Sequence, residues 1–215
     1  MNAPISTPPA APIPSPAAPR RTSLRGLAVT AVLITVVLMI GTGLIYPLLM
    51  TGLTQIIFPH QANGSLVTNA KGQIIGSSLI GQNFTAARYF HPRLSAAGKG
   101  YDATSSGGTN LGPTNKVLLQ RTIAQANLIR KQNHLPANYP LPADAVSTSA
   151  SGLDPDISPA YAYLQVARVA HARGLSVAEV RALVGKHVEG RTLGILGEPR
   201  VNVLELNLAL DRLKK

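Results

Sequence analysis

One continuous apolar block near the N-terminus dominates the hydrophobic pattern. From Gly26 to Tyr46 the sequence reads GLAVTAVLITVVLMIGTGLIY, with no charge and nothing more polar than threonine. A helix of roughly 20 such residues crosses the roughly 30 Å hydrocarbon core of a bilayer and satisfies its own backbone hydrogen bonds. Its threonine hydroxyls can also donate to carbonyls of the preceding turn. The pattern predicts a tail at residues 1–25, a transmembrane helix at 26–49 and an outer domain at 50–215.

Two other structures give similar apolar blocks, namely a buried core helix and a cleaved signal peptide. A core helix normally carries a polar stripe, which is absent between Gly26 and Tyr46. A signal peptide has an apolar stretch of roughly 7 to 15 residues, followed by small residues at the cleavage site. This block is longer, and the bulky Leu48 and Leu49 follow it. A retained anchor is therefore favoured, with cleavage as the alternative.

The charges that flank the block indicate its orientation. Arg20, Arg21 and Arg25 precede it without any acidic residue, and the next charged residue after it is Lys71. Because positively charged flanks stay inside, we expect a single-pass protein with its tail in the cytoplasm and its C-terminal domain on the outer side. Tyr46 suits the outer interface, where amphipathic rings lie at headgroup level.

The segments on either side of the span differ in composition. Residues 1–19 are uncharged and interleave proline with alanine and serine, which is typical of a disordered or extended tether. Pro47 is expected to end or kink the helix. The stretch from Leu48 to His60 stays uncharged and is too short for a second crossing. We expect it to follow the outer interface or to pack on a neighbouring helix.

Local signals in the first half of the outer domain predict a hairpin, a long loop and a helix. Ser65–Thr68 and Gln73–Gly76 flank a turn signal that ends in glycine. Residues 95–115 are rich in Gly, Ser, Thr and Asn, which is typical of a long functional or disordered loop. Lys116–His134 has helical periodicity after a cap at Thr114 or Asn115. Its expected apolar face consists of Leu119, Ile123 and Ala126.

The C-terminal part contains the clearest helix start and stop signals. They comprise an N-cap followed by proline, a terminal glycine, a Ser–Glu capping box and an Asn–Glu pair at the same spacing. The residues are Ser158, Pro159, Gly174, Ser176, Glu179, Asn202 and Glu205. The last pair begins a helix with Leu206, Leu210 and Leu213 on one face. The expected fold class is α+β: an N-terminal transmembrane helix, then a mainly helical extracytoplasmic domain with a small β-hairpin or sheet.

Composition narrows the classes of partner. No cysteine is present, so an exported domain cannot rely on disulfides. The net charge is +11, and the surplus lies between His60 and His134, where eight basic residues face one acid, Asp102. Nucleic acid is not expected as a partner, because only 4% of the residues are aromatic and the domain lies outside. Acidic lipid headgroups and a partner subunit remain as alternatives.

The motifs that approach catalytic or ligand sites are all incomplete. The five histidines lack the spacing that places two metal ligands on one helix face. Asp154-x-Asp156-x-Ser158 opens like a calcium loop, but Pro159 replaces the required glycine, so a turn and helix cap is preferred. Gly107-x4-Gly112 lacks the Lys-Ser/Thr of a phosphate loop, and no complete G-x-S-x-G occurs. We expect no catalytic residue, metal or cofactor bound by this chain.

Several segments together resemble the C subunit of the Kdp-type potassium-transporting P-type ATPase. The first is YPLLMTGLTQIIFPHQANGSLV, at residues 46–67. The others are SLIGQNF, ARYFHPR, SGGTNLGPTN at 106–115 and LGEPRVNVLELNLALD at 196–211. The resemblance extends from the span to the C-terminus, includes the linking helices, and omits only the proline-rich tail.

The resemblance implies a complex in the bacterial plasma membrane that takes up potassium at high affinity and is driven by ATP hydrolysis. Its partners would be a channel-like potassium-translocating subunit, an ATP-hydrolysing P-type subunit and a small single-helix subunit, all in the lipid bilayer. The complex would use ATP, magnesium and potassium. The family is also described as catalytic chaperones that raise the ATP affinity of the pump subunit. The alternative is a stand-alone membrane-anchored extracytoplasmic enzyme or ligand-binding domain.

Two groups of residues are candidates for contact with partners. Gly41 and Gly43 permit close approach of a neighbouring helix. The glycine-rich loop at 106–115 is the second group. The hypothesis is that the anchor packs on the translocating subunit while the outer domain covers its entrance, with the basic face toward headgroups or a partner. The candidate residues are Gly41, Gly43, Tyr46, Pro47, Gly52, Gly107, Gly108, Asn110, Leu111 and Asn115.

Overall fold

The computed structural model describes residues 23–69 and 71–213, and the chain divides into two compact units. The first unit ends at Ile57 and the second begins at Phe58. The proline-rich tail lies outside the described residues, as do Arg20 and Arg21. Each unit is described by itself below.

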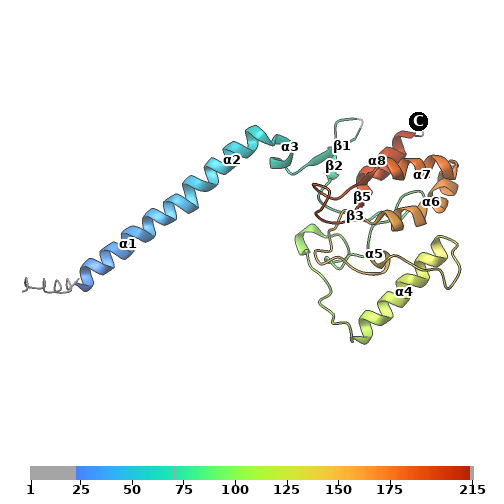
Figure 1. The fold of residues 1–215 in the computed structure, drawn as a ribbon, viewed down its shortest axis with the longest axis horizontal. Coiled ribbons are helices and arrows are strands. Elements are labelled where there is room, and N and C mark those ends of the chain that lie inside the picture. Colours follow the sequence, from blue (N-terminus) through green and yellow to red (C-terminus); the bar gives the residue numbers. More distant parts are fainter. Residues whose placement is uncertain (1–22, 70, 214–215) are drawn as a thin grey trace, which may run out of the picture. The chain divides into compact units, whose positions relative to one another are not determined.

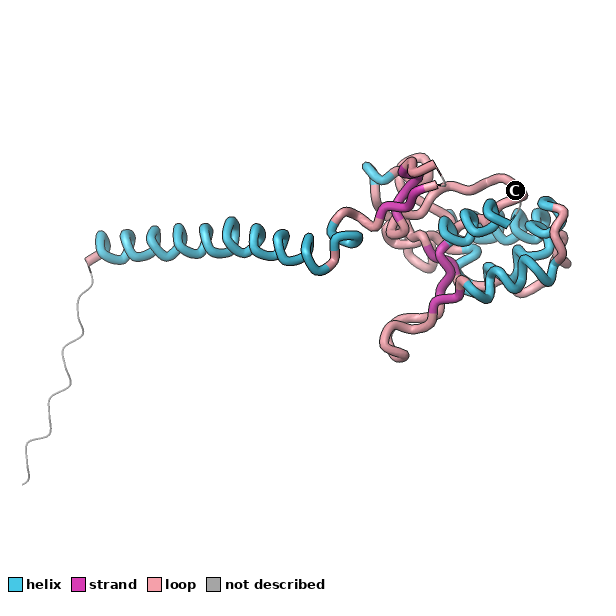
Figure 2. The backbone as a smooth tube through the Cα atoms, turned by 90° about the horizontal axis from the view of Figure 1, so that it is seen from above, coloured by secondary structure: helices cyan, strands magenta, loops and turns pink. Residues whose placement is uncertain are grey.

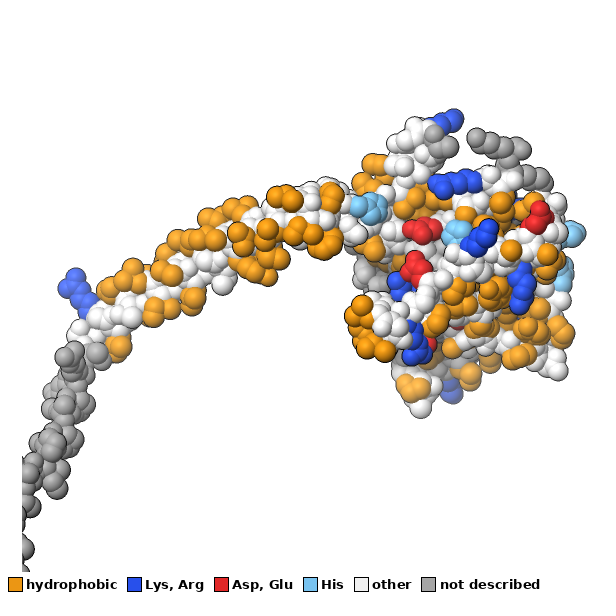
Figure 3. Space-filling model, turned by 45° about the horizontal axis from the view of Figure 1, so that its top comes forward, with side chains coloured by type: hydrophobic (Ala, Val, Ile, Leu, Met, Phe, Trp, Pro, Cys, Tyr) orange, Lys and Arg blue, Asp and Glu red, His pale blue; other side chains and the backbone are white. Residues whose placement is uncertain are grey.

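The first unit contains one continuous apolar helix. It consists of α1 (Leu24–Ile40), the π-helical segment η1 (Gly41–Ile45) and α2 (Tyr46–Ile57), 34 residues in all. Side chains around its visible surface are almost entirely apolar (Figure 3), and none of its described residues is buried. This is the one helix of the described chain that is long and apolar enough to cross a membrane.

Hydroxyl groups within this helix behave as expected for a membrane span. Thr30, Thr35 and Thr42 donate from Oγ1 to the carbonyls of Gly26, Ala31 and Leu38, at 2.9, 2.8 and 2.7 Å. Each polar hydroxyl is therefore satisfied inside the helix, which lowers the cost of placing it among lipid tails.

The helix does not end at Pro47. Proline has no amide hydrogen and clashes with the preceding turn of a regular α-helix. Immediately before it the helix widens into η1, and the Tyr46 N–H donates to the carbonyl of Gly41, five residues earlier. A π-helical turn changes the local hydrogen-bond register, and insertions of this kind are a recognised way for a helix to absorb an irregularity. The helix thus continues to Ile57.

The second unit begins with a short helix and a hairpin. Helix α3 (Pro59–Ala62) is followed by the antiparallel strands β1 (Leu66–Thr68) and β2 (Ile74–Ser77). In the turn, the Asn69 side-chain oxygen accepts hydrogen bonds from the backbone N–H groups of Lys71 and Gln73, at 2.9 and 3.0 Å. The predicted hairpin is confirmed.

A long loop and helix α4 follow. The loop contains only the 3-10 turn η2 (Ala103–Ser105), and the Asn115 side chain caps α4 (Lys116–Gln132) as predicted. The expected apolar face of α4 does not pack into the core. Leu119 and Ile123 are exposed, and Ile129 is the buried residue of this helix. Figure 1 shows α4 at the edge of the unit. Periodicity shows which residues share a side of a helix, but the position of the core selects the buried side.

Three C-terminal helices form the main core. They are α6 (Pro159–Arg173), α7 (Val177–Lys186) and α8 (Val203–Leu213), and they lie together in Figures 1 and 2. Ser158 caps α6, Gly174 ends it with φ +62°, and the Ser176–Glu179 capping box is complete. The core residues in these helices include Val166, Val169, Val180, Val184, Leu206 and Leu210. The predicted apolar face of α8 is buried at Leu206 and Leu210, whereas Leu213 is exposed because the helix ends there.

A second sheet completes the α+β fold. Its antiparallel order is β3 (Asp156–Ile157), β5 (Arg200–Asn202) and β4 (Val188–Glu189), and the four-residue helix α5 (Ala143–Val146) precedes it. These strands were not predicted, because two or three residues are too few to display alternation. The predicted cap at Asn202 is nevertheless present, since its Oδ1 accepts from the Glu205 N–H at 3.1 Å.

A buried segment without a partner strand crosses this core. The N–H and carbonyl of Phe90 bond to the carboxamide of Asn207 at 2.8 and 3.0 Å, and those of His91 bond to the carboxamide of Gln165 at 2.7 and 3.1 Å. Phe90 itself is fully buried. Two side-chain amides thereby supply the donors and acceptors that a neighbouring strand would normally supply.

We expect Asn207→Ala to destabilise the second unit by about 2–6 kcal/mol, because it leaves a buried N–H and a buried carbonyl of Phe90 unpaired at about 1–3 kcal/mol each. The measurement is thermal or urea unfolding of the full chain in detergent. Asn127→Ala, an exposed asparagine on α4, is the matched control. Equal stability of the two variants would contradict the role assigned to Asn207.

Candidate partner interface

The predicted contact residues of the helix all lie on an uncovered surface. A Cβ atom placed on Gly41, Gly43 or Gly52 meets nothing within 4 Å. Tyr46 is exposed, and Pro47 beside it is exposed as well. Each of these positions therefore has room for a neighbouring helix or lipid chain.

Gly41 and Gly43 do not point in the same direction. Residues two apart on a helix lie on nearly opposite sides, so one neighbouring helix cannot contact both glycines closely. Gly41 begins the π-helical turn and supplies the carbonyl that accepts from Tyr46, so it has a function within its own helix. Contact of these positions with a partner remains a prediction.

The glycines of the predicted loop pack against another part of their own unit. The Gly107 N–H donates to the Ser151 carbonyl at 2.8 Å, and Ser106 Oγ donates to the same oxygen at 3.0 Å. A Cβ on Gly108 would lie 3.0 Å from the Ala150 carbonyl oxygen. Gly108 therefore allows close approach of two backbones, a structural role that the sequence did not reveal, whereas a Cβ on Gly107 would meet nothing within 4 Å.

The remaining predicted residues of this loop differ in their burial and in their roles. Asn115 caps α4 by accepting from the Val117 N–H at 2.8 Å. Leu111 is half-buried, whereas Asn110 is exposed and has a φ of +51°. Asparagine tolerates this left-handed conformation better than most residues. Of the five predicted contact residues in this loop, Asn110 is the exposed one, so it is the best placed of the five to meet another molecule.

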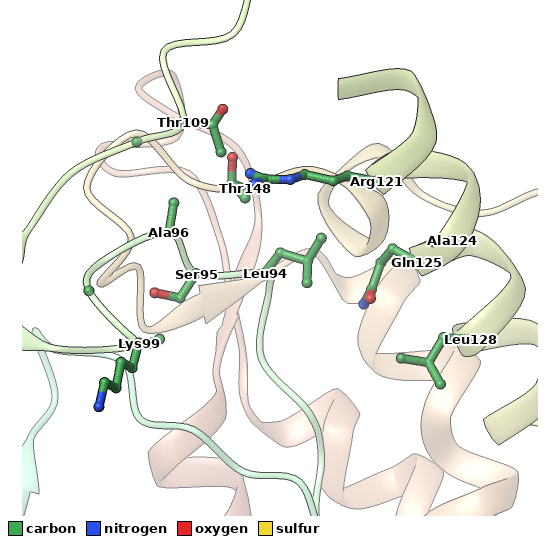
Figure 4. Close-up of a pocket in the computed structure, with 13 residues that line it drawn as sticks. Leu94, Ser95, Ala96, Lys99, Thr109, Arg121, Ala124, Gln125, Leu128 and Thr148 are labelled. Carbon is green, nitrogen blue, oxygen red and sulfur yellow. The ribbon is translucent and has the colours of Figure 1, made fainter. Parts of the chain in front are cut away.

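The loop and α4 form opposite walls of a pocket of about 650 Å³ (Figure 4). Arg121 extends from α4 toward Thr109 and Thr148, and Lys99 lies on the far wall. Both cations are exposed, and neither has an ion-pair partner among the described residues. The first pocket is thus a basic hollow in which the predicted loop meets α4.

A second and larger pocket, of about 1060 Å³, was not predicted. Its walls carry Lys131, Arg168 and three histidines, and none of the described residues that line it is acidic. The histidines are His91, His134 and His171. They are far apart in the sequence, with His91 and His134 in loops and His171 on α6, so spacing rules could not group them.

The cation at the base of this second pocket is buried. Arg168 donates to the carbonyls of Ala87 and Tyr89 at 2.6 and 3.0 Å and to Gln165 Oε1 at 2.6 Å, and it forms no ion pair with any described carboxylate. Burial lowers its pKa to about 10. Burial, and next the charge of Arg168, also lower the pKa of His91.

The other chemical motifs have structural explanations. Asp154 accepts from the Asp156 N–H at 3.0 Å and pairs with Arg93 at 2.7 Å, while Ser158 caps α6. The turn-and-cap interpretation of this motif is confirmed. Within residues 23–69 and 71–213, no cluster of three or more His, Cys, Asp or Glu side chains could hold a metal ion.

An uncovered apolar helix followed by a mainly helical α+β unit defines a membrane-associated protein with one candidate span. The family model for the c chain of K⁺-transporting ATPases, KdpC, matches residues 28–212. The chain therefore belongs to the KdpC family of potassium-transporting ATPase subunits.

Individual relatives agree with this assignment. A potassium-transporting ATPase KdpC subunit of Myxococcus xanthus is 57% identical over 85% of this chain and 86% of its own length. That of Koribacter versatilis is 55% identical over 85% of this chain and 93% of its own, and that of Mycobacterium tuberculosis is 56% identical over 80% and 90%. The resemblance noted in the sequence is confirmed.

We expect acidification from about pH 7.5 to 5.5 to destabilise the second unit through His91. The pKa of His91 is lowered in the folded state. The unfolded chain therefore takes up a proton first, near its ordinary pKa of about 6.5, and stability falls as the pH drops below that value.

The measurement is the free energy of unfolding across this pH range for the wild type and for His91→Gln, which should show a shallower dependence. His171→Gln, which removes an exposed imidazole from the same pocket, is the matched control. Equal slopes for the wild type and His91→Gln would contradict the assignment.

Proposed function

We propose that this chain is a non-catalytic accessory subunit that helps to assemble and stabilise an ATP-driven potassium uptake complex in the bacterial plasma membrane. Its KdpC family membership over residues 28–212 carries the proposal. The stand-alone enzyme or ligand-binding domain is less favoured, because the related chains are described as subunits of an ATPase.

The sidedness proposed is a cytoplasmic N-terminus and an extracytoplasmic second unit. The arginine-rich flank before the span supports it. A helix of 34 residues is about 51 Å long, which exceeds the roughly 30 Å apolar core of a bilayer. We place the crossing at residues 26–49. The last part of the helix, residues 50–57, then lies at the outer surface and forms the start of the segment 50–215 that we assign to the outer side.

The proposed partners are a channel-like potassium-translocating subunit, an ATP-hydrolysing P-type subunit and a small single-helix subunit. The open positions Gly41, Gly43 and Gly52 support packing of the span against other membrane helices, with Gly41 and Gly43 on nearly opposite sides. We place the outer unit over the potassium entrance of the translocating subunit. Arg121 and Lys99 of the first pocket then face headgroups or protein, since a positive ion path would repel potassium.

The family's catalytic-chaperone role is a second and finer proposal. The basic second pocket, with no acidic residue among its described lining, has a charge that suits a polyphosphate. On the proposed sidedness, however, this pocket does not meet cytoplasmic ATP. An increase in ATP affinity would therefore act through contacts with the partner subunits.

Purification in mild detergent tests the assembly proposal. A tagged chain should bring three further subunits and potassium-stimulated ATPase activity, and deleting the chain should reduce recovery of the others. Elution of the chain alone, without ATPase activity, would support the stand-alone alternative.

Charge reversal in the second pocket tests whether this pocket contributes to the affinity of the complex for ATP. We expect Lys131→Glu to leave the KM for ATP of the purified complex within about twofold of the wild type, because an extracytoplasmic pocket does not bind the substrate nucleotide. Arg121→Glu, in the first pocket, is the matched control. A large and selective rise in KM for Lys131→Glu would instead favour nucleotide binding in the second pocket.

Sidedness can be tested with single cysteines, because the chain has none of its own. A membrane-impermeant maleimide should label Asn127→Cys in intact spheroplasts and Ser6→Cys only after lysis. The opposite labelling pattern would reverse the proposed orientation.

A further inference from the structure

The loop between β4 and β5 displays three large apolar side chains that no described residue of this unit covers. Leu193, Ile195 and Leu196 are 84%, 74% and 56% exposed, and we call them the apolar tip. In Figure 2 the loop projects from the strands, away from the three C-terminal helices. Exposed leucine or isoleucine residues are common singly, but three together at the end of one loop are not a typical solvated surface.

The tip is held in one conformation by its own backbone. The N–H groups of Thr192 and Leu196 each donate to the other residue's carbonyl at 2.9 Å, and the Gly194 N–H donates to the Arg191 carbonyl at 3.0 Å. At the base, Arg191 Nη2 donates to both carboxylate oxygens of Glu198 at 2.8 Å. A loop organised in this way loses little conformational entropy on binding.

Leu193 also has an unfavourable backbone conformation. Its φ is +56°, in the left-handed region, where a branched apolar residue is rare and glycine is normal. Gly194 and Gly197 adopt positive φ in the same loop, as expected for glycine. A leucine at a strained and solvent-exposed position does not stabilise this unit, which indicates that its side chain contacts another molecule.

We propose that the apolar tip inserts into an apolar pocket on a protein subunit of the same ATPase complex. This inference rests on the proposed function, which supplies the partner subunits, and it adds the surface by which the chain engages one of them. Three side chains are too few for a whole interface, but they suit the buried centre of one, surrounded by polar contacts.

The charges around the tip favour protein over an anionic bilayer as the occupant. Arg191 is paired with Glu198, and Arg200 is paired with Glu189 at 2.7 Å and with Asp156 at 3.2 Å. Loops that bind acidic lipid carry unpaired basic residues beside their apolar side chains. Here the nearby cations are already neutralised, whereas the basic surplus of this unit lies between His60 and His134.

Two substitutions remove two of the three apolar side chains of the tip and should leave the unit folded. Leu193→Gly relieves the strained φ, and Ile195→Ser shortens a largely exposed side chain, so each should leave the unfolding transition unchanged or slightly raised. Together they should weaken retention of the chain in the complex by at least about 30-fold, the effect typical of central interface residues. Val177→Ser, on the 54% exposed Val177 of α7, is the matched control.

The measurement is the fraction of tagged chain that keeps the other subunits after dilution in mild detergent. Failure of the wild-type chain to retain any subunit would overturn the proposed function. Retention by the wild type and equally by the Leu193→Gly/Ile195→Ser variant would overturn only the inference about the tip.

A cross-linking probe then identifies the molecule that contacts the apolar tip. A benzophenone maleimide on Ile195→Cys is attached to one site, because the chain has no other cysteine. In the purified complex it should give one cross-linked band with a different subunit. Products with lipid alone, with a second copy of this chain, or no product at all would each overturn the proposal.

Discussion

The second unit depends on how the buried backbone around Phe90 is satisfied. Its two sheets are too small to pair this segment, yet the segment passes through the core. Asn207 from α8 and Gln165 from α6 bond to it as a neighbouring strand would. Because each carboxamide has both a donor and an acceptor, two residues fix the segment against two helices at once.

Two buried arginines, Arg168 and Arg173, extend the same arrangement of side chains bonded to backbone carbonyls. Arg173 donates to the Arg88 carbonyl at 2.7 Å and pairs with Asp211 at 2.8 Å, so its charge is compensated. Among the residues that the structure describes, Arg168 bonds to carbonyl and amide oxygens and to no carboxylate. This buried charge contributes, with Lys131, to the basic second pocket, and after burial it is the next cause of the lowered pKa of His91.

Elements set by local chemistry were predictable from the sequence. The span follows from length and composition, the hairpin from its turn, and the helix ends from Ser158, Gly174 and the Ser176–Glu179 box. Features that depend on tertiary contact were not. The short strands pair only because distant segments meet, and the histidines of the second pocket share no sequence spacing. In the loop, the contacts of Gly107 and Gly108 with residues 150–151 also depend on tertiary structure, so glycine composition could not reveal them.

The sparse attachment of α4 has a mechanical consequence. A helix of 17 residues is joined to the core by one fully buried side chain, Ile129, near its C-terminal end. Segments with so few buried contacts open at a lower free energy than the core that supports them. The N-terminal turns of α4 are therefore expected to separate from the unit more easily than the core opens, and the wall of the first pocket that Arg121 forms would move with them.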